Sequence, residues 1–292
     1  MNRSKIWVGI GAFVLTGAGT SATVPAAPEV RLDRAADAQA ETAPAPRPVH
    51  HWVLAQAKPG GEGGEGGEGG EGGEAGIDPE AADRDPVAYG VALEVIAAHY
   101  YAGLAAYESG QKEAGAEMFA HGHSEVYAAM ADVFEKRGVR TLGEKLEKAV
   151  ATASGAASVK AVRKDVAAVL AALEEASKSG PASPGDPVAT KAKVMAEMLD
   201  RAAAQYALAV KGKEYEPYLD GYGFLASARA GGKDVLPWLK KKNAKQAADF
   251  QAALALGAKA YPGIKRPRRP AVDSGKFLAA ASAVKFDASR LN

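Results

Sequence analysis

Three side chains in one short stretch of the chain are of the types that bind metal ions or transfer protons. His121, His123 and Glu125 lie close together in the stretch 112–137. Imidazole and carboxylate groups suit iron, zinc, nickel or copper, and an i, i+4 pair such as His121 and Glu125 lets two ligands converge on one ion. The pattern therefore predicts a transition-metal site.

The stretch itself is predicted to be one amphipathic helix, in which each residue turns the chain by about 100°. His123 follows Phe119 by four residues and falls in the apolar sector, so it is expected to point toward the core. His121 stands in a row between Glu117 and Glu125, which stack along another face. The alternative is an ordinary solvated acidic face with a hydrogen-bonded core histidine, because such spacing alone is not specific for metals.

A preceding helix supplies a fourth candidate ligand. Asp85 is a suitable N-cap, Pro86 fits a first helical turn, and Gly110 is a suitable end. The short turn at Gly110 favours antiparallel packing on the central helix, which brings His99 toward His121 or His123. The predicted metal ligands are therefore His121, His123, Glu125 and His99.

The rest of the body is predicted to be helical and to contain an internal duplication. The sequence Asp-Pro-Val-Ala occurs at 85–88 and again at 186–189, each time before a long helix, a glycine turn and a second helix. This predicts an all-α antiparallel bundle over 85–262, with repeats 85–180 and 186–262, followed by a basic link and an accessory helix over 263–292. The aromatic residues of the second repeat are expected to form core rather than a ligand site.

Three local features predict helix boundaries within this body. Thr141 and Glu144 have the spacing of a capping box. The pair at 231–232, Gly-Gly, is expected to end a helix, and Asp234 is expected to cap the next one.

The N-terminal part has the composition of a leader and a tether. Residues 1–22 combine early basic residues, a short apolar run and small residues, which predicts a signal peptide and a periplasmic or secreted protein. Membrane association is expected only if this segment stays uncleaved. Residues 23–84 are rich in Ala and Pro and include the GGE repeats of 60–74, which predicts a disordered linker. The sequence has no Cys, so no disulfide supports the fold.

The composition argues against several classes of function. A net charge of +1 gives no global reason to bind nucleic acid. The sequence contains no GxSxG, P-loop, dinucleotide fingerprint or Cys nucleophile, so the protein is predicted not to be an enzyme. Acid–base chemistry by His99 with Glu94 or Glu125 is the remaining enzymatic alternative. Basic residues within 240–269 could meet an acidic envelope protein partner.

Two parts of the sequence resemble known groups of proteins. The leader, the Gly/Glu-rich tether and the pattern His-x-His-x-x-x-Tyr at 121–127 resemble uncharacterised secreted all-helical proteins of Gram-negative bacteria. The segment from Tyr206 to Phe224 is similar to periplasmic helical domains associated with high-affinity iron permeases, over under a quarter of the chain. This resemblance implies a link to iron. Imelysin-like proteins use His-x-x-Glu, and here Ser124 and Val126 stand where that motif has Glu.

These observations predict a periplasmic or secreted helical binding protein, with iron or copper as the expected ligand or with a role in metal uptake. The alternative is a non-enzymatic envelope scaffold that holds no ligand. The mobile linker predicted for 60–74 and the basic residues favour this alternative.

Overall fold

Aspartate side chains begin several helices in the structure, a computed structural model that describes residues 76–292. The Asp85 carboxylate accepts a hydrogen bond from the Val87 amide, and the Asp186 carboxylate accepts one from Val188. In both places a proline occupies the first turn, where its missing N–H costs nothing. All regular elements in the described residues are helices, so the all-α prediction is confirmed.

The helices follow one another with short connections. They are α1 (Pro79–Ala82), α2 (Pro86–Glu108), α3 (Lys112–His121), the π-helical segment η2 (Gly122–Tyr127), α4 (Ala128–Lys136), α5 (Leu142–Ser154), α6 (Val159–Ser177), α7 (Pro187–Lys211), α8 (Glu216–Lys242), α9 (Ala244–Ala260) and α10 (Ser274–Ser289).

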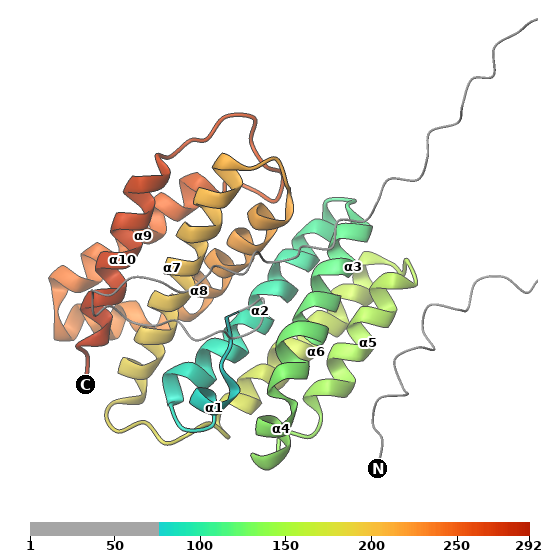
Figure 1. Ribbon diagram of the computed structural model, residues 1–292, viewed down its shortest axis with the longest axis horizontal. Helices are drawn as coiled ribbons and strands as arrows, with labels where there is room; N and C mark the ends of the chain where they lie inside the picture. The colour runs from blue at the N-terminus through green and yellow to red at the C-terminus, as the bar shows by residue number, and fades with distance from the viewer. Residues whose placement is uncertain (1–75) are drawn as a thin grey trace, which may run out of the picture. The chain divides into compact units, whose positions relative to one another are not determined.

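Helix α2 is the central element. It contacts α3 and α6 on one side and α7 and α8 on the other, so it separates a group made of α3–α6 from a group made of α7–α10 (Figure 1). Gly103 lies against Gly115 of α3, and His99 lies against Gly122, so α2 and α3 run antiparallel.

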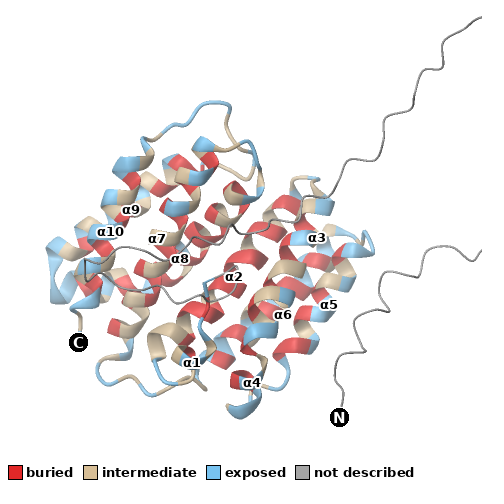
Figure 2. Ribbon diagram, in the orientation of Figure 1, coloured by how far each residue is buried: buried red, intermediate tan, exposed pale blue. Residues whose placement is uncertain are grey.

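The distribution of buried residues follows from the central position of α2. Buried residues run along most of α2 and along the inward faces of its neighbours, and exposed residues cover the outer faces (Figure 2). Tyr100 and Phe119 stack at 4.9 Å between ring centroids, and both side chains are fully buried. Among the described helices, α2 alone is long and apolar enough to cross a membrane, and two thirds of its most apolar window is buried inside the protein. The other helices therefore cover its apolar surface, which stabilises the fold.

Two predicted boundaries and two predicted caps are wrong. Helix α1 forms within the segment predicted to be a disordered linker, and Ile77 just before it is buried. Helix α5 begins directly after Thr141, as predicted, but Thr141 makes no side-chain cap hydrogen bond to it. Helix α8 does not end at 231–232 but continues to Lys242. Asp234 therefore lies inside α8 and caps no helix, and Asn243 caps α9. Gly231 is needed for packing instead, because a Cβ there would lie 2.1 Å from the sulfur of Met195 in α7.

Helix α10, predicted as an accessory helix, packs on α7 and α9 and buries Phe277. It closes the group formed by α7, α8 and α9. The predicted signal peptide and nearly all of the predicted linker, with its GGE repeats, lie outside the described residues.

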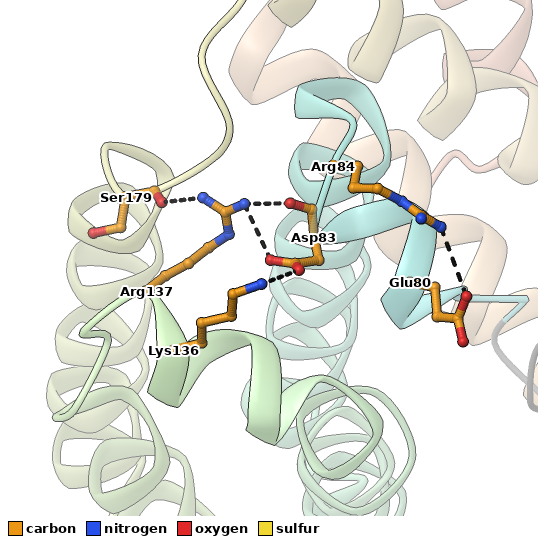
Figure 3. Close-up of polar contacts among 6 residues, drawn as sticks. All are labelled: Glu80, Asp83, Arg84, Lys136, Arg137 and Ser179. Atoms are coloured by element: carbon orange, nitrogen blue, oxygen red, sulfur yellow. Dashed lines mark hydrogen bonds and ion pairs between the residues drawn. The ribbon is translucent and has the colours of Figure 1, made fainter.

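A polar clamp fixes the end of the molecule near α1. The Arg137 guanidinium donates to the Asp83 backbone and side chain and, at 3.1 Å, to the Ser179 carbonyl, while Lys136 pairs with the same Asp83 carboxylate (Figure 3). The guanidinium also lies 5.5 Å from the ring centre of Tyr89. The clamp therefore ties α1, the end of α4 and the segment after α6 to α2.

Candidate functional site

The contact between α2 and α8 holds a set of buried and partly buried ionisable side chains. Glu94 and His99 come from α2, and Ser227 and Asp220 face them from α8. Gly223 makes this contact close, because a Cβ at that position would lie 2.2 Å from the Ala98 carbonyl oxygen. We call this line of contact the α2–α8 seam.

His99 has a defined hydrogen-bonding state. Its Nδ1 lies 2.8 Å from the Val95 carbonyl oxygen, which can only accept, so the proton sits on Nδ1. The lone pair of Nε2 then faces the Asp220 carboxyl group, with Oδ1 at 3.9 Å. Burial lowers the pKa of His99 to about 4, and burial together with Glu216 raises the pKa of Asp220 to about 7. Both side chains therefore favour their neutral forms.

His121 lies beside this pair, at the end of α3. Its Nδ1 is 3.4 Å from Glu216 Oε1 and 3.7 Å from Glu125 Oε1, and its ring centroid is 6.5 Å from that of His99. His121 was expected in an acidic row along its own helix. The structure shows that it also faces α8, through Glu216.

His123 points away from this group. Its ring stacks on Tyr127 at 5.5 Å between centroids, and its Nε2 is 3.9 Å from Glu147 Oε1 on α5. The side chain is partly buried, and burial lowers the pKa of His123. The π-helical segment explains the altered direction, because its wider turns break the 100° register on which the prediction relied.

The structure brings three of the four predicted ligands into one region, His99, His121 and Glu125, and leaves His123 outside it. In residues 76–292, however, no group of three or more His, Cys, Asp or Glu side chains is placed so that it could hold a metal ion. The predicted metal site stays a prediction.

Two members of this region, Asp220 and Glu216, were not predicted from the sequence. Asp220 lies four residues before Phe224 and seven before Ser227, so helical spacing puts it on the same face as buried residues. That spacing was the available signal. Glu216 is at the start of α8 and mostly exposed, and no local pattern marks it.

A cavity of about 630 Å³ opens farther along the same seam. Its walls combine polar and apolar surface and come largely from α2, α6, α7 and α8. The apolar residues include Leu93, Ala97, Leu173, Val194 and Met195. Its mouth is polar: Lys191 and Asp234 line it and form an ion pair between α7 and α8. We call this space the seam cavity.

Glu94 is the acidic residue within the apolar wall that α2 contributes to the seam cavity. Its Oε2 accepts a hydrogen bond of 2.6 Å from the fully buried Ser227 hydroxyl. Burial raises the pKa of Glu94, against the opposing effects of Ser227 and Lys191. Burial and the Glu94 charge also raise the pKa of Tyr101, which lines the same cavity. The sequence contained a signal for this site, because Glu94 is the only charged residue between Asp85 and Glu108.

Comparison of the chain with family models, with curated proteins and with solved structures found no match. The resemblance to secreted helical proteins and to domains associated with iron permeases stays a prediction. The function must therefore be argued from the α2–α8 seam.

Proposed function

We propose that this protein is a helical binding protein whose ligand is a small organic molecule held in the seam cavity. The observation that carries the proposal is a cavity of about 630 Å³ that many apolar side chains line together with one partly buried carboxyl group, Glu94. Ligand sites in proteins are typically cavities of roughly 300–1,000 Å³ with apolar linings and a few placed polar groups. They also form preferentially between groups of helices, as here between α6 and α7.

The neutral apolar dye N-phenyl-1-naphthylamine tests this proposal, because its fluorescence rises in an apolar site. We expect the full chain to bind about one equivalent of the dye. Ala97→Phe places an aromatic ring in the cavity and is expected to weaken binding at least tenfold, which corresponds to about 1.4 kcal/mol.

The matched control is Ala255→Phe, on an exposed position of a neighbouring, more open groove lined mainly by α8 and α9. It adds the same ring and should leave dye binding unchanged. Dye binding that is unaffected by Ala97→Phe, in a variant with unchanged circular dichroism, would show that the cavity is not the binding site.

A second proposal is the predicted transition-metal site, now placed at His99 and His121. One observation favours it: His99 donates its Nδ1 proton to a backbone carbonyl, as metal-binding histidines commonly do, and this leaves Nε2 free to bind. Asp220 and Glu125 are the nearby carboxylates. A metal would have to draw these side chains closer together than they lie in the structure.

Elemental analysis of protein purified without chelator tests the metal proposal, followed by titration with Zn²⁺ and Cu²⁺. We expect a stoichiometric metal in the wild type and its loss in His99→Ala/His121→Ala. His123→Ala is the matched control, because His123 lies outside the group. Equal metal content in all three proteins would exclude this site.

We also propose that the helical body consists of two copies of one unit. In the first copy the contacts run α2–α3, α3–α5, α5–α6 and α6–α2, and in the second they run α7–α8, α8–α9, α9–α10 and α10–α7. Both copies begin with a capped Asp-Pro-Val-Ala segment. On this proposal the duplicated unit has four helices, one pair more than the sequence suggested.

Secretion remains a proposal that rests on residues 1–22. Cell fractionation together with N-terminal sequencing of the mature chain tests it. The scaffold alternative predicts in addition that cross-linking in cells captures an envelope protein and that neither dye nor metal binds.

A further inference from the structure

The seam cavity offers a specific kind of recognition beyond its apolar walls. Glu94 carries the carboxyl group in its wall, and the Ser227 hydroxyl fixes one of its oxygens from the far side of the seam. No salt bridge to Glu94 is present in the described residues, and Lys191, which also lines the cavity, pairs with Asp234. In the described residues Glu94 therefore forms no ion pair, and Lys191 acts on it only through its charge.

We propose that the ligand of the seam cavity is an organic cation, an amine with an apolar body, whose ammonium group pairs with Glu94. The inference rests on the proposed function and adds the chemical class of the ligand. Glu94 is partly buried, and a carboxylate in such a position loses part of its hydration, which is costly unless a cation or other polar groups compensate. An ammonium group compensates that cost, and the apolar body fills the space between Leu93, Leu173 and Met195.

The surroundings favour a cation over the other classes of small molecule. An anionic ligand would be repelled by Glu94, the acidic group within the wall. Tyr89 also lines the cavity, but its hydroxyl already donates to the Ala176 carbonyl, at 3.0 Å. Aromatic faces such as that of Tyr101 further suit a cation.

Competition against bound N-phenyl-1-naphthylamine measures the preference with three ligands of similar shape: 4-phenylbutylamine, 4-phenylbutanol and 4-phenylbutyrate. We expect the amine to compete about 10- to 100-fold better than the alcohol at pH 8, since hydrogen bonds to charged groups contribute about 1.5–3 kcal/mol. The acid is expected to compete least well.

Two variants assign the preference to a residue. Glu94→Gln keeps an acceptor for Ser227 but removes the charge, so amine and alcohol should then compete equally. Glu174→Gln removes an exposed carboxylate at the same cavity and should leave the tenfold or greater preference in place.

The outcomes separate the two proposals. If the dye does not bind to the cavity, the proposed function fails. If the dye binds and is displaced equally by amine and alcohol in the wild type, the cavity binds ligands but the cationic class is wrong. A preference that survives Glu94→Gln, in a variant with an unchanged melting temperature, also overturns the role of Glu94.

Discussion

His99 and Asp220 face each other where α2 crosses α8. Burial lowers the pKa of His99 and raises the pKa of Asp220, so each side chain favours its neutral form. The two shifts act on stability in opposite directions. For Asp220 the folded pKa is raised from 3.8 to about 7, so its contribution is fully present below pH 3.8 and is lost as the pH rises through 7. For His99 the folded pKa is lowered from 6.5 to about 4, so its contribution is present above pH 6.5 and is lost as the pH falls through 4.

The substitution Asp220→Asn separates these contributions in the metal-free protein. In the wild type, ionisation of Asp220 destabilises the folded protein as the pH rises, and the variant lacks the carboxyl group that ionises. Relative to wild type, the variant should gain about 3 kcal/mol in unfolding free energy between pH 5 and pH 8. Urea unfolding of both proteins with chelator present measures this difference. A difference that does not change with pH would show that Asp220 ionises normally in the folded protein.

Arg137 offers a residue-scale test of the clamp in Figure 3. Arg137→Ala removes the contacts with Asp83 and Ser179 and is expected to lower the unfolding free energy by about 2–4 kcal/mol. Arg84→Ala is the control, because the Arg84 side chain pairs, within residues 76–292, only with exposed Glu80, at 3.6 Å, and should cost less than about 0.5 kcal/mol. Equal effects in chemical denaturation would contradict the assignment of the clamp to Arg137.

At the scale of elements, α8 contains two neighbouring glycines whose packing environments differ. Its paired glycines lie inside the helix, although glycine is a poor helix former. Gly231 faces α7 so closely that a methyl group would overlap Met195. Gly232 has more room, since the nearest atom to an added Cβ, on Leu254, is 3.7 Å away.

The two neighbouring glycines should therefore respond in opposite ways to alanine. Gly231→Ala overpacks the contact with Met195 and is expected to cost about 1–3 kcal/mol. Gly232→Ala fits and is expected to stabilise by up to about 1 kcal/mol through helix propensity. Thermal and urea unfolding measure both. Destabilisation of equal size at both positions would show that helix propensity or backbone geometry, rather than Met195, sets the effect.

For the whole molecule, α2 joins the groups α3–α6 and α7–α10 through its contacts with both. Since α2 supplies core residues to both groups, unfolding of one group exposes apolar surface that it shares with the other through α2. The described part of the chain is therefore expected to unfold as one cooperative unit.

A destabilising substitution in one group should consequently lower the stability measured in the other group. Phe134→Ala in α4 removes a fully buried ring and is expected to cost about 3–5 kcal/mol. We expect it to lower the urea midpoint reported by Trp238 fluorescence in α8, in a background with Trp7→Phe and Trp52→Phe. An unchanged Trp238 midpoint, with a shifted midpoint for circular dichroism, would mean that the two groups unfold independently.

Local physics allowed the sequence to predict the helices and many of their starting points. Asp85 and Asp186 cap helices because a carboxylate two residues before a free amide can bind it in any context, and apolar residues at helical spacing predict a buried face. The same reasoning placed His99 near His121, since a short turn brings consecutive helices together. These features depend on residues close in the chain.

Only the tertiary structure decided which ionisable groups meet. Glu94 and Ser227 are 133 residues apart, and their hydrogen bond exists because α8 packs across α2. The π-helical segment redirected His123, and close contact with Met195 of α7 leaves room only for a glycine at 231. The seam cavity likewise depends on how four helices leave space between them. Such features depend on how segments far apart in the sequence pack together. The spacing of residues within one helix carries no information about that packing.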